Sequence, residues 1–270
     1  MGVPSLFQYL KTRYPVCVQK VDESFPLPVY DNLFIDFNSL IHDVKGGNDD
    51  IVYCTTYEVF AARLFVELDR LISFVNPQKL VYIAIDGTVP RCKLTQQRSR
   101  RFESSRKQGN CDNSDNEIFD SNVISPGTEF MERINEVLKY YIKMRMETNP
   151  AFRKIQFIYS SHRHSGEGEH KVMNYLRDCI KSGKYDDNER SLVFGSDADM
   201  IFLVSSLHQK NIDIMRKELP PRGIDAIGYH SQVSSLFILF IIGLLSIPSF
   251  YLSRDSIYGD SRSRCLLAYT

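Results

Sequence analysis

Acidic residues follow apolar runs or begin helix-forming segments at four places in this sequence. Strand ends and helix starts gather at one edge of an open sheet, so we expect these carboxylates to meet there. Their repulsion would raise their pKa values and destabilise the fold unless a strong counter-charge were present. Mg²⁺ and Mn²⁺ prefer oxygen ligands and would supply that charge. The six residues are Asp36, Asp86, Glu167, Glu169, Asp197 and Asp199.

Phosphodiester hydrolysis is the chemistry that such a cluster would support. Two divalent ions held several ångströms apart activate water and stabilise the leaving oxygen of a phosphodiester. Each carboxylate alone has a structural explanation, because Asp86-Gly87 is a common turn and acids are stabilised in the first turn of a helix. The six together favour a metal site. Zinc is not favoured, since the cysteines and histidines lack the spacing of a zinc site.

A basic segment follows the apolar run that ends at Asp86. Five positive charges stand within eleven residues, with only Glu103 nearby to offset them. A solvated helix face is the alternative interpretation, but such a face does not need so dense a cluster. Guanidinium groups and amides such as that of Gln97 match the geometry of phosphate oxygens. We therefore expect a phosphate site beside the metal site, and the basic residues available to it are Arg91, Lys93, Arg98, Arg100 and Arg101.

Alternating strands and helices must position these groups. The apolar runs carry almost no charge before their ends, which is typical of strands buried on both faces of a parallel sheet. The helices repeat apolar residues at three- and four-residue steps. The pattern predicts an α/β fold with a mostly parallel sheet flanked by helices. The predicted strands are 32–37, 80–85, 154–159 and 191–195, and the predicted helices are 4–13, 57–75, 125–146 and 167–181.

Two segments stand apart from this alternation. Residues 108–121 are rich in Asn, Asp, Ser and Gly, which predicts a disordered loop. The run from Leu236 to Leu252 carries no charge and lies at the lower limit of a membrane span. Ser246 and Pro248 weaken a membrane span, so a buried helix or strand is favoured. We expect an apolar helix over 233–252.

Composition bounds the class of protein and its compartment. A chain of 270 residues with 43% hydrophobic and 24% charged residues is typical of a globular protein. The net charge is zero, so any affinity for nucleic acid must come from local patches. The six cysteines form no CxxC pair, and the N-terminus lacks the apolar core of a signal peptide. These features predict an intracellular protein of the cytoplasm or nucleus.

Six stretches make the chain similar to a known family. They stand in the family's order over roughly residues 1–205, namely MGVPSLFQYL, FIDFNSLIH, AIDGTVPRCKLTQQRSRRF, ISPGTEFM, SGEGEHKVMNYLR and GSDADMIFL. The chain resembles the N-terminal nuclease region of the XRN 5′→3′ exoribonucleases. The resemblance implies a nuclease core of the PIN and flap-endonuclease type in residues 1–205, followed by a divergent segment over 206–270. It also implies processive degradation of single-stranded, 5′-monophosphorylated RNA to mononucleotides.

The resemblance assigns roles to the residues that match the family's motifs. The six carboxylates would hold two metal ions, Mg²⁺ or Mn²⁺. His42 would stack on the terminal base, and a basic pocket would hold the 5′-phosphate. A pocket sized for one phosphate would reject a capped or triphosphorylated end by size and charge. The pocket residues would be Lys93, Gln97, Arg100 and Arg101.

The chain departs from the family's pattern in its C-terminal part. A G-N-D-F-x-P element supplies the family with a further metal-binding Asp, and the counterpart here is GLLSIP, with Leu245 in the place of that Asp. The aromatic residue expected opposite His42 is usually a Trp, and this chain contains none. The alternatives to an exoribonuclease are therefore a homologue that binds 5′-phosphorylated RNA without efficient cleavage and a structure-specific DNA nuclease.

Overall fold

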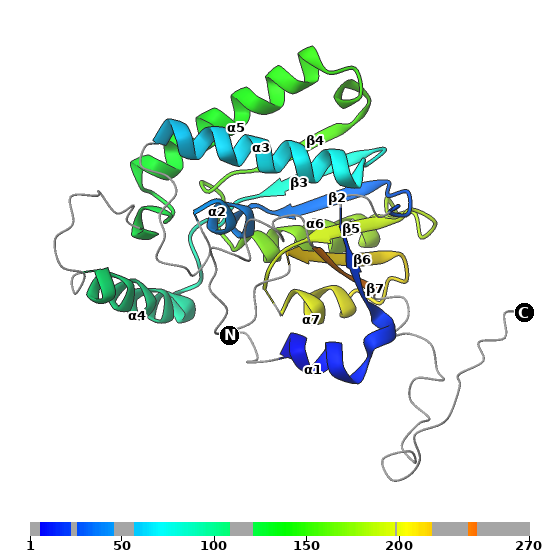
Figure 1. Cartoon of the computed structure of the whole chain (residues 1–270), viewed down its shortest axis with the longest axis horizontal. Coiled ribbons are helices and arrows are strands. Elements are labelled where there is room, and N and C mark those ends of the chain that lie inside the picture. The colour runs from blue at the N-terminus through cyan, green and yellow to red at the C-terminus, as the bar shows by residue number, and fades with distance from the viewer. Residues whose placement is uncertain are drawn as a thin grey trace, which may run out of the picture.

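A seven-stranded sheet forms the centre of the molecule in a computed structural model, with strand order β1-β7-β6-β5-β2-β3-β4 (Figure 1). The structure describes residues 6–22, 26–45, 57–108, 121–197, 199–217 and 237–241. Five neighbouring strands are parallel, and β7 runs antiparallel to both β6 and β1. The prediction of a mostly parallel sheet is confirmed. The strands are β1 (Val18–Val21), β2 (Asn32–Asp36), β3 (Leu80–Ala84), β4 (Gln156–Ser160), β5 (Ser191–Phe194), β6 (Ile212–Lys217) and β7 (Phe237–Ile241).

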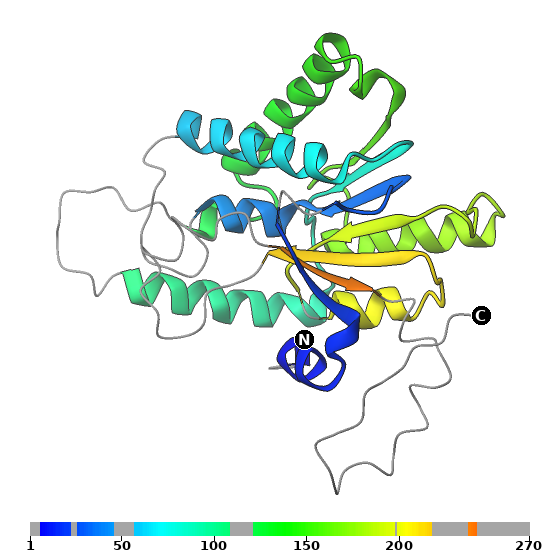
Figure 2. The same ribbon diagram turned by 45° about the vertical axis from the view of Figure 1, so that its right-hand side comes forward.

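Helices cover both faces of the sheet (Figures 1 and 2). Leu33 and Ile35 of β2 pack on one side, in the same apolar core as α2, α3 and α5. Phe34 of β2 points to the other side, in the core that α6 and α7 share with partly buried residues of α1. This alternation explains the continuous apolar runs, since each strand has a buried face on both sides. The covering helices are α1 (Leu6–Arg13), α2 (Phe37–Lys45), α3 (Tyr57–Val75), α5 (Glu129–Thr148), α6 (Gly168–Lys181) and α7 (Met200–Ser205).

The basic segment forms a helix, α4 (Arg91–Gln108), that lies to one side of the sheet (Figure 2). None of its side chains that the structure describes is buried. Its sequence explains this, because polar and charged residues occupy all of its faces. The helix is therefore free to present these side chains to a ligand. Three short 3₁₀ helices complete the elements, η1 (Pro15–Cys17), η2 (Ser121–Val123) and η3 (Phe152–Lys154).

The predicted helix start at Ser125-Pro126 was wrong. Helix α5 begins at Glu129, where the Thr128 hydroxyl accepts a hydrogen bond from the Met131 amide at 3.3 Å. A Thr at the cap satisfies one of the free amides of the first turn, which Ser125 does not do here. The Ser125 hydroxyl instead donates to the Asn122 carbonyl at 2.7 Å.

The C-terminal apolar run also differs from the prediction where the structure describes it. Phe237–Ile241 form strand β7 between β1 and β6, instead of part of an apolar helix over 233–252. A short apolar run does not distinguish a buried helix from a strand, and aromatic and β-branched residues favour the strand. The rest of 233–252 lies outside the described residues, as does nearly all of the predicted loop at 108–121. No helix among the described residues is long and apolar enough to span a membrane.

Candidate metal centre

The strand order reverses at the carboxyl ends of β2 and β5, a position that forms a crevice in open α/β sheets. The chain passes from β2 to β3 and β4 on one side, and then returns to β5 and β6 on the other side of β2. Open α/β sheets bind ligands at such a point of reversal. Asp36 is the last residue of β2, and Asp197 and Asp199 follow the end of β5. The topology therefore directs these acidic residues to one crevice.

Asp36 and Asp86 are fixed by neighbours on two helices, α2 and α6. The Ser39 hydroxyl of α2 donates to Asp36 Oδ2 at 2.8 Å. The Gly168 amide at the start of α6 donates to Asp86 Oδ1 at 2.6 Å. A Cβ atom at position 168 would lie 2.5 Å from Asp36 Oδ1 and 3.3 Å from Asp86 Oδ1. Glycine is therefore required at 168 for the two carboxylates to approach the helix.

Two further acids come from the start of α6. Glu167 occupies the cap position of this helix, but its side chain makes no capping hydrogen bond. Glu169 lies in the first turn and is 5% exposed. Ligand atoms of Glu169, Asp197 and Asp199 lie within 4.8 Å of one another, a spacing that could hold a metal ion. The residues that sequence placed at separate strand and helix ends thus come together.

Burial and mutual repulsion raise the pKa values of the carboxylates in the cluster. Burial, and then the charge of Asp86, raise the pKa of Asp36. Burial also raises the pKa of Asp86, although the Gly168 amide acts against this. The pKa of Glu169 rises to about 8, first through burial and then through Asp199 and Asp197. Burial and the charge of Asp199 raise the pKa of Asp197 in the same way.

Buried oxygen atoms in the cluster lack partners. Among the described residues, Asp36 Oδ1, Glu167 Oε1 and Glu169 Oε2 are buried and accept no hydrogen bond. Buried polar atoms are normally satisfied, so unpartnered oxygens gathered in one place are the arrangement expected of ligands for a cation. Oxygen donors alone, gathered from several elements, suit a hard divalent ion. The residues present therefore fit a divalent metal site.

The basic helix meets the acidic cluster at two residues. Lys93 Nζ of α4 forms a close ion pair with Glu167 Oε2. Burial lowers the pKa of Lys93, but the hydrogen bond from Lys93 to Glu167 and the nearby acids outweigh it, so the net pKa is raised. Arg100 acts on Asp197, where its positive charge opposes the rise in pKa. The side of α4 that carries Lys93 and Arg100 therefore faces the acidic cluster.

The remaining sequence-predicted residues lie on α4 and α2. Gln97 and Arg101 are both half-buried, and Arg101 Nη2 lies 3.5 Å from Gln97 Oε1. They stand one helical turn apart, on the same helix as Lys93 and Arg100. His42 is exposed on α2, beyond Asp36. Its role in base stacking stays a prediction, and Leu245 lies outside the described residues.

Lys171 is a buried cation that the sequence interpretation missed. Its Nζ donates to the Ile85 carbonyl at 2.7 Å and to the Ser161 carbonyl at 2.9 Å. These carbonyls follow the last paired residues of β3 and β4, where the strands separate. Burial lowers the pKa of Lys171 to about 8, and Asp86 acts against this. The sequence did contain a signal for this role. Lys171 stands on the inward-facing side of an amphipathic helix, and a lysine is rarely buried there without partners.

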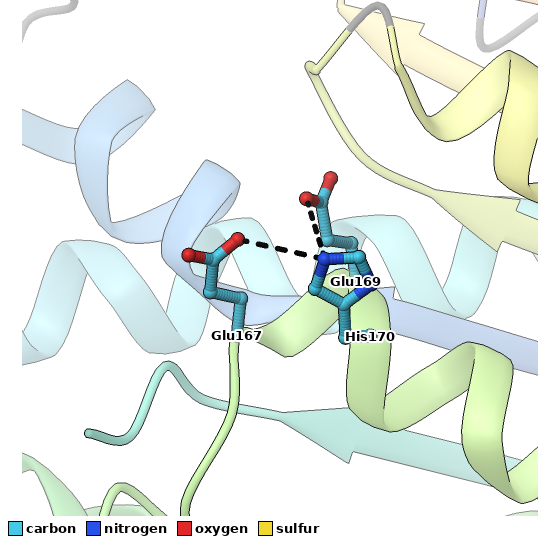
Figure 3. Close-up of side chains that lie close together, drawn as sticks. All are labelled: Glu167, Glu169 and His170. Carbon is cyan, nitrogen blue, oxygen red and sulfur yellow. Dashed lines mark ion pairs between the residues drawn. The ribbon is translucent and has the colours of Figure 1, made fainter. Parts of the chain in front are cut away.

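His170 is the second residue that was missed. Its Nε2 lies 3.9 Å from Glu167 Oε2 and 3.9 Å from Glu169 Oε1 (Figure 3). The ring is half-exposed and stands at the edge of the acidic cluster. The spacing of the histidines, which does not match a zinc site, gives no reason to separate His170 from His162 and His164. The helix distinguishes His170 from the other two histidines. Residues three positions apart share a helix face, so His170 lies beside Glu167.

Comparisons with known proteins agree with this architecture. A family model described as "XRN 5'-3' exonuclease N-terminus" matches residues 1–218. The chain is 38% identical over 230 residues to "5'-3' exoribonuclease 1" of Saccharomyces cerevisiae, which covers 81% of this chain and 15% of that protein. It is 34% identical over 232 residues to "5'-3' exoribonuclease 1" of Homo sapiens, covering 81% of this chain and 13% of that protein.

A plant relative gives a similar result. The chain is 36% identical over 257 residues to "5'-3' exoribonuclease 2" of Arabidopsis thaliana, which covers 80% of this chain and 25% of that protein. The chain thus spans between 13% and 25% of the length of these three relatives. The similarity is therefore to one part of each relative and not to its whole length.

Proposed function

The chain belongs to the XRN 5′-3′ exonuclease N-terminus family, and on that premise we propose that it is a metal-dependent 5′→3′ exoribonuclease. It hydrolyses single-stranded, 5′-monophosphorylated RNA stepwise to mononucleotides, in RNA turnover or processing within the cell. One observation carries the proposal. Unpartnered buried carboxylate oxygens lie in one crevice, and Lys93 of the basic helix contacts Glu167 of that crevice.

The chain's own residues have separate tasks in this proposal. The six carboxylates hold two ions, Mg²⁺ or Mn²⁺, which when bound supply activation of water and stabilisation of the leaving oxygen. The basic residues of α4 hold the 5′-phosphate, and His42 supports the terminal base by stacking. The contact between Lys93 and Glu167 keeps the phosphate pocket next to the cleavage site. That proximity limits the distance between the 5′ end and the bond that is cleaved, so one nucleotide leaves in each step.

The domain organisation is part of the proposal. We assign the nuclease region to about residues 1–205, and the divergent segment to 206–270, from the similar stretches. The family match extends to residue 218, and β6 and β7 from the second segment pair with the same sheet. This supports a role for the second segment in completing the nuclease core.

A homologue that binds RNA without efficient cleavage is the second candidate. The observation that favours it is Leu245, which stands where the family's additional metal-binding Asp is expected. Loss of one carboxylate would weaken metal binding, because hard ions depend on the number and charge of their oxygen ligands. The basic residues of α4 would still bind a 5′-phosphate.

Degradation of matched RNA substrates separates these candidates. Purified full chain is incubated with 5′-monophosphate and 5′-hydroxyl forms of one RNA, with Mg²⁺, with Mn²⁺ or with EDTA. Release of mononucleotides from the phosphorylated form alone, and only with metal, supports the exoribonuclease. Tight binding of that RNA without cleavage in either metal supports the second candidate. Preference for a branched DNA substrate would contradict both, and would indicate a structure-specific DNA nuclease.

A further inference from the structure

We propose that His170 is a nitrogen ligand on the Glu167–Glu169 side of the metal centre, and that it favours a transition-metal ion such as Mn²⁺ over Mg²⁺ there. The inference rests on the proposed metal centre and adds a donor of a different kind to it. Oxygen donors alone would accept either ion. A single imidazole changes the preference of one side of the centre.

The geometry around His170 is that of three donors with space between them. Nε2 of His170 lies 3.9 Å from an oxygen of Glu167 and 3.9 Å from an oxygen of Glu169. These distances are too long for hydrogen bonds, which join such atoms at about 2.7–3.2 Å. Two ligands that each lie about 2.1 Å from one ion can be up to about 4.2 Å apart. The observed distances therefore suit a shared ion better than direct contact.

Each glutamate faces His170 with one oxygen, Glu167 Oε2 or Glu169 Oε1, and the other oxygen of each carboxylate is buried without a hydrogen-bond partner among the described residues. Glu167 is 4% exposed and Glu169 is 5% exposed, and each has one buried oxygen that accepts no hydrogen bond from the described residues. Lys93 Nζ is bonded to Glu167 Oε2, the same oxygen that lies 3.9 Å from His170 Nε2, and Glu167 Oε1 is left for a further ligand. Ligand atoms of Glu167, Glu169 and His170 all lie within 4.8 Å of one another. The unpartnered oxygens thus provide evidence for a ligand that does not depend on the acidic cluster alone.

The first turn of α6 explains why these three residues meet. Glu167 and His170 stand three positions apart, so they share a face of the helix. Figure 3 shows the His170 ring beside both carboxylates, with its nitrogen directed toward them. The ring is 49% exposed, so its placement does not depend on core packing. His170 can therefore be replaced without disturbing the buried part of the sheet.

The chemical consequence follows from the donor types. Mg²⁺ takes oxygen ligands and gives up its water reluctantly, so an imidazole adds little to its binding. Imidazole is a ligand for first-row transition ions, and although Mn²⁺ binds most weakly among them, it accepts nitrogen more readily than Mg²⁺ does. We expect His170 to increase the affinity for Mn²⁺ while leaving the affinity for Mg²⁺ nearly unchanged.

Pulsed electron paramagnetic resonance of bound Mn²⁺ tests the proposal directly, because it detects nitrogen coordinated to the ion. The full chain is compared with His170→Gln and with the control His164→Gln, whose exposed histidine lies in the loop before α6. We expect a ¹⁴N signal in the wild type and in the control, and its loss in His170→Gln. We also expect Mn²⁺ affinity to fall by about tenfold or more in His170→Gln. Displacement of bound Mn²⁺ by Mg²⁺ gives the affinity for Mg²⁺. This affinity should differ by less than about threefold between the wild type and His170→Gln.

The outcomes separate this inference from the proposed metal centre. Mn²⁺ bound without a ¹⁴N signal in the wild type, or with an unchanged signal in His170→Gln, overturns the role of His170 and leaves the carboxylate centre intact. No bound Mn²⁺ in the wild type overturns both. Glu169→Gln serves as the reference for a lost centre and should greatly weaken Mn²⁺ binding. Circular dichroism of each variant establishes that it is folded, so a lost signal reports on ligation.

Discussion

Asp86 is partly buried, and one hydrogen bond positions its carboxylate while another positions its backbone. The Gly168 amide holds Oδ1 at 2.6 Å, and the Asn38 side chain accepts a hydrogen bond from the Asp86 amide at 3.0 Å. Its backbone and its side chain are thus both positioned. If Asp86 holds a metal ion, as proposed, its removal should affect the chemical step more than RNA binding, because the basic helix remains.

We predict that Asp86→Ala lowers the cleavage rate by at least about 100-fold, since a metal ion contributes several kcal/mol to the transition state and each 1.4 kcal/mol is tenfold. RNA affinity, measured by fluorescence anisotropy with 5′-labelled monophosphate RNA, should change by less than about fivefold. Single-turnover assays give the cleavage rate. Retained cleavage would contradict the assignment of Asp86 as a ligand.

Arg101 provides a test of the phosphate pocket. A hydrogen bond to a charged group contributes about 1.5–3 kcal/mol, so Arg101→Ala should reduce the preference for 5′-monophosphate over 5′-hydroxyl RNA by about 10- to 100-fold. Arg106→Ala is the matched control, because this arginine lies further along α4 and is exposed. The measurement is the ratio of binding constants for the two RNAs. An equal loss of affinity for both RNAs would instead indicate a general electrostatic surface.

Lys171 is expected to matter for stability as well as for the site. Lys171→Met would leave the Ile85 carbonyl without the lysine donor, whereas the Ser161 carbonyl would keep its hydrogen bond from the His164 amide at 3.1 Å. One unsatisfied buried group costs about 1–3 kcal/mol, so the free energy of unfolding should fall by about that amount. Urea denaturation measures this change. Lys181→Met, at the exposed end of α6, is the control and should have an effect within about 0.5 kcal/mol.

At the scale of elements, the sequence predicts best the parts whose local pattern and tertiary role agree. β2 and β3 are buried at every residue, and their unbroken apolar runs predicted this. The strand ends then indicated where the acids gather. The start of α5 was wrong because Ser125-Pro126 and Thr128 both resemble helix starts, and only the hydrogen bond to Met131 distinguishes them.

The parts that sequence did not predict depend on partners distant in the chain. β1 and β7 are strands because each pairs with the other, and this pairing joins residues near 20 to residues near 240. Lys171 belongs to the same class. The helix pattern shows that this lysine faces inward, but its partners at the ends of β3 and β4 follow only from the tertiary arrangement. The carboxylate set was accessible because the chain repeats the same signal at each strand end.

β6 offers a prediction at the element scale. Asp213 is 1% exposed and accepts hydrogen bonds from the Tyr30 hydroxyl at 2.9 Å and from Arg190 Nε at 3.1 Å. Tyr30 precedes β2 and Arg190 precedes β5, so the three residues join the amino ends of neighbouring strands. Burial raises the pKa of Asp213, while Arg190 acts against this. The arrangement is that of a structural contact, far from the carboxyl ends where the acids gather.

We expect Asp213→Ala to lower the free energy of unfolding by about 2 kcal/mol, because it leaves the buried Tyr30 hydroxyl without its acceptor and removes the partner of Arg190, whose side chain is 37% exposed. Tyr30→Phe should cost only about 1 kcal/mol, since it removes a single hydrogen bond and leaves the ion pair. Thermal or urea denaturation measures both. The second variant is the control for packing at this site. Equal losses in the two variants would show that the ion pair contributes nothing.

For the whole molecule, the acidic crevice links metal binding to stability. The net charge of the chain is zero, so repulsion in the crevice is a local property and is not a consequence of overall charge. Repulsion between ionised carboxylates lowers the free energy of unfolding when no cation is bound. This loss of stability depends on pH, because a protonated carboxyl group does not repel its neighbours.

Glu169 gives the sign of this dependence. Its pKa rises from an ordinary 4.5 to about 8 in the folded protein. Below pH 4.5 the folded and unfolded states both bind the proton, and the shift costs nothing. Between pH 4.5 and 8 the folded state binds more protons, so stability falls as pH rises. Above pH 8 the loss in the free energy of unfolding is complete. It amounts to about 1.4 kcal/mol for each unit by which the pKa of Glu169 differs between the folded and unfolded states. The pKa values of Asp36, Asp86 and Asp197 are raised in the same direction.

We therefore predict that the metal-free protein loses stability between pH 5 and pH 8, and that Mg²⁺ or Mn²⁺ stabilises it more at pH 8 than at pH 5. Unfolding by urea is measured in EDTA and in each metal at both pH values. Glu169→Gln isolates the contribution of this side chain, because other groups also titrate in the range. The difference in stability between wild type and Glu169→Gln should change in favour of the variant as pH rises without metal. A difference that is independent of pH would show that Glu169 is ionised throughout this range.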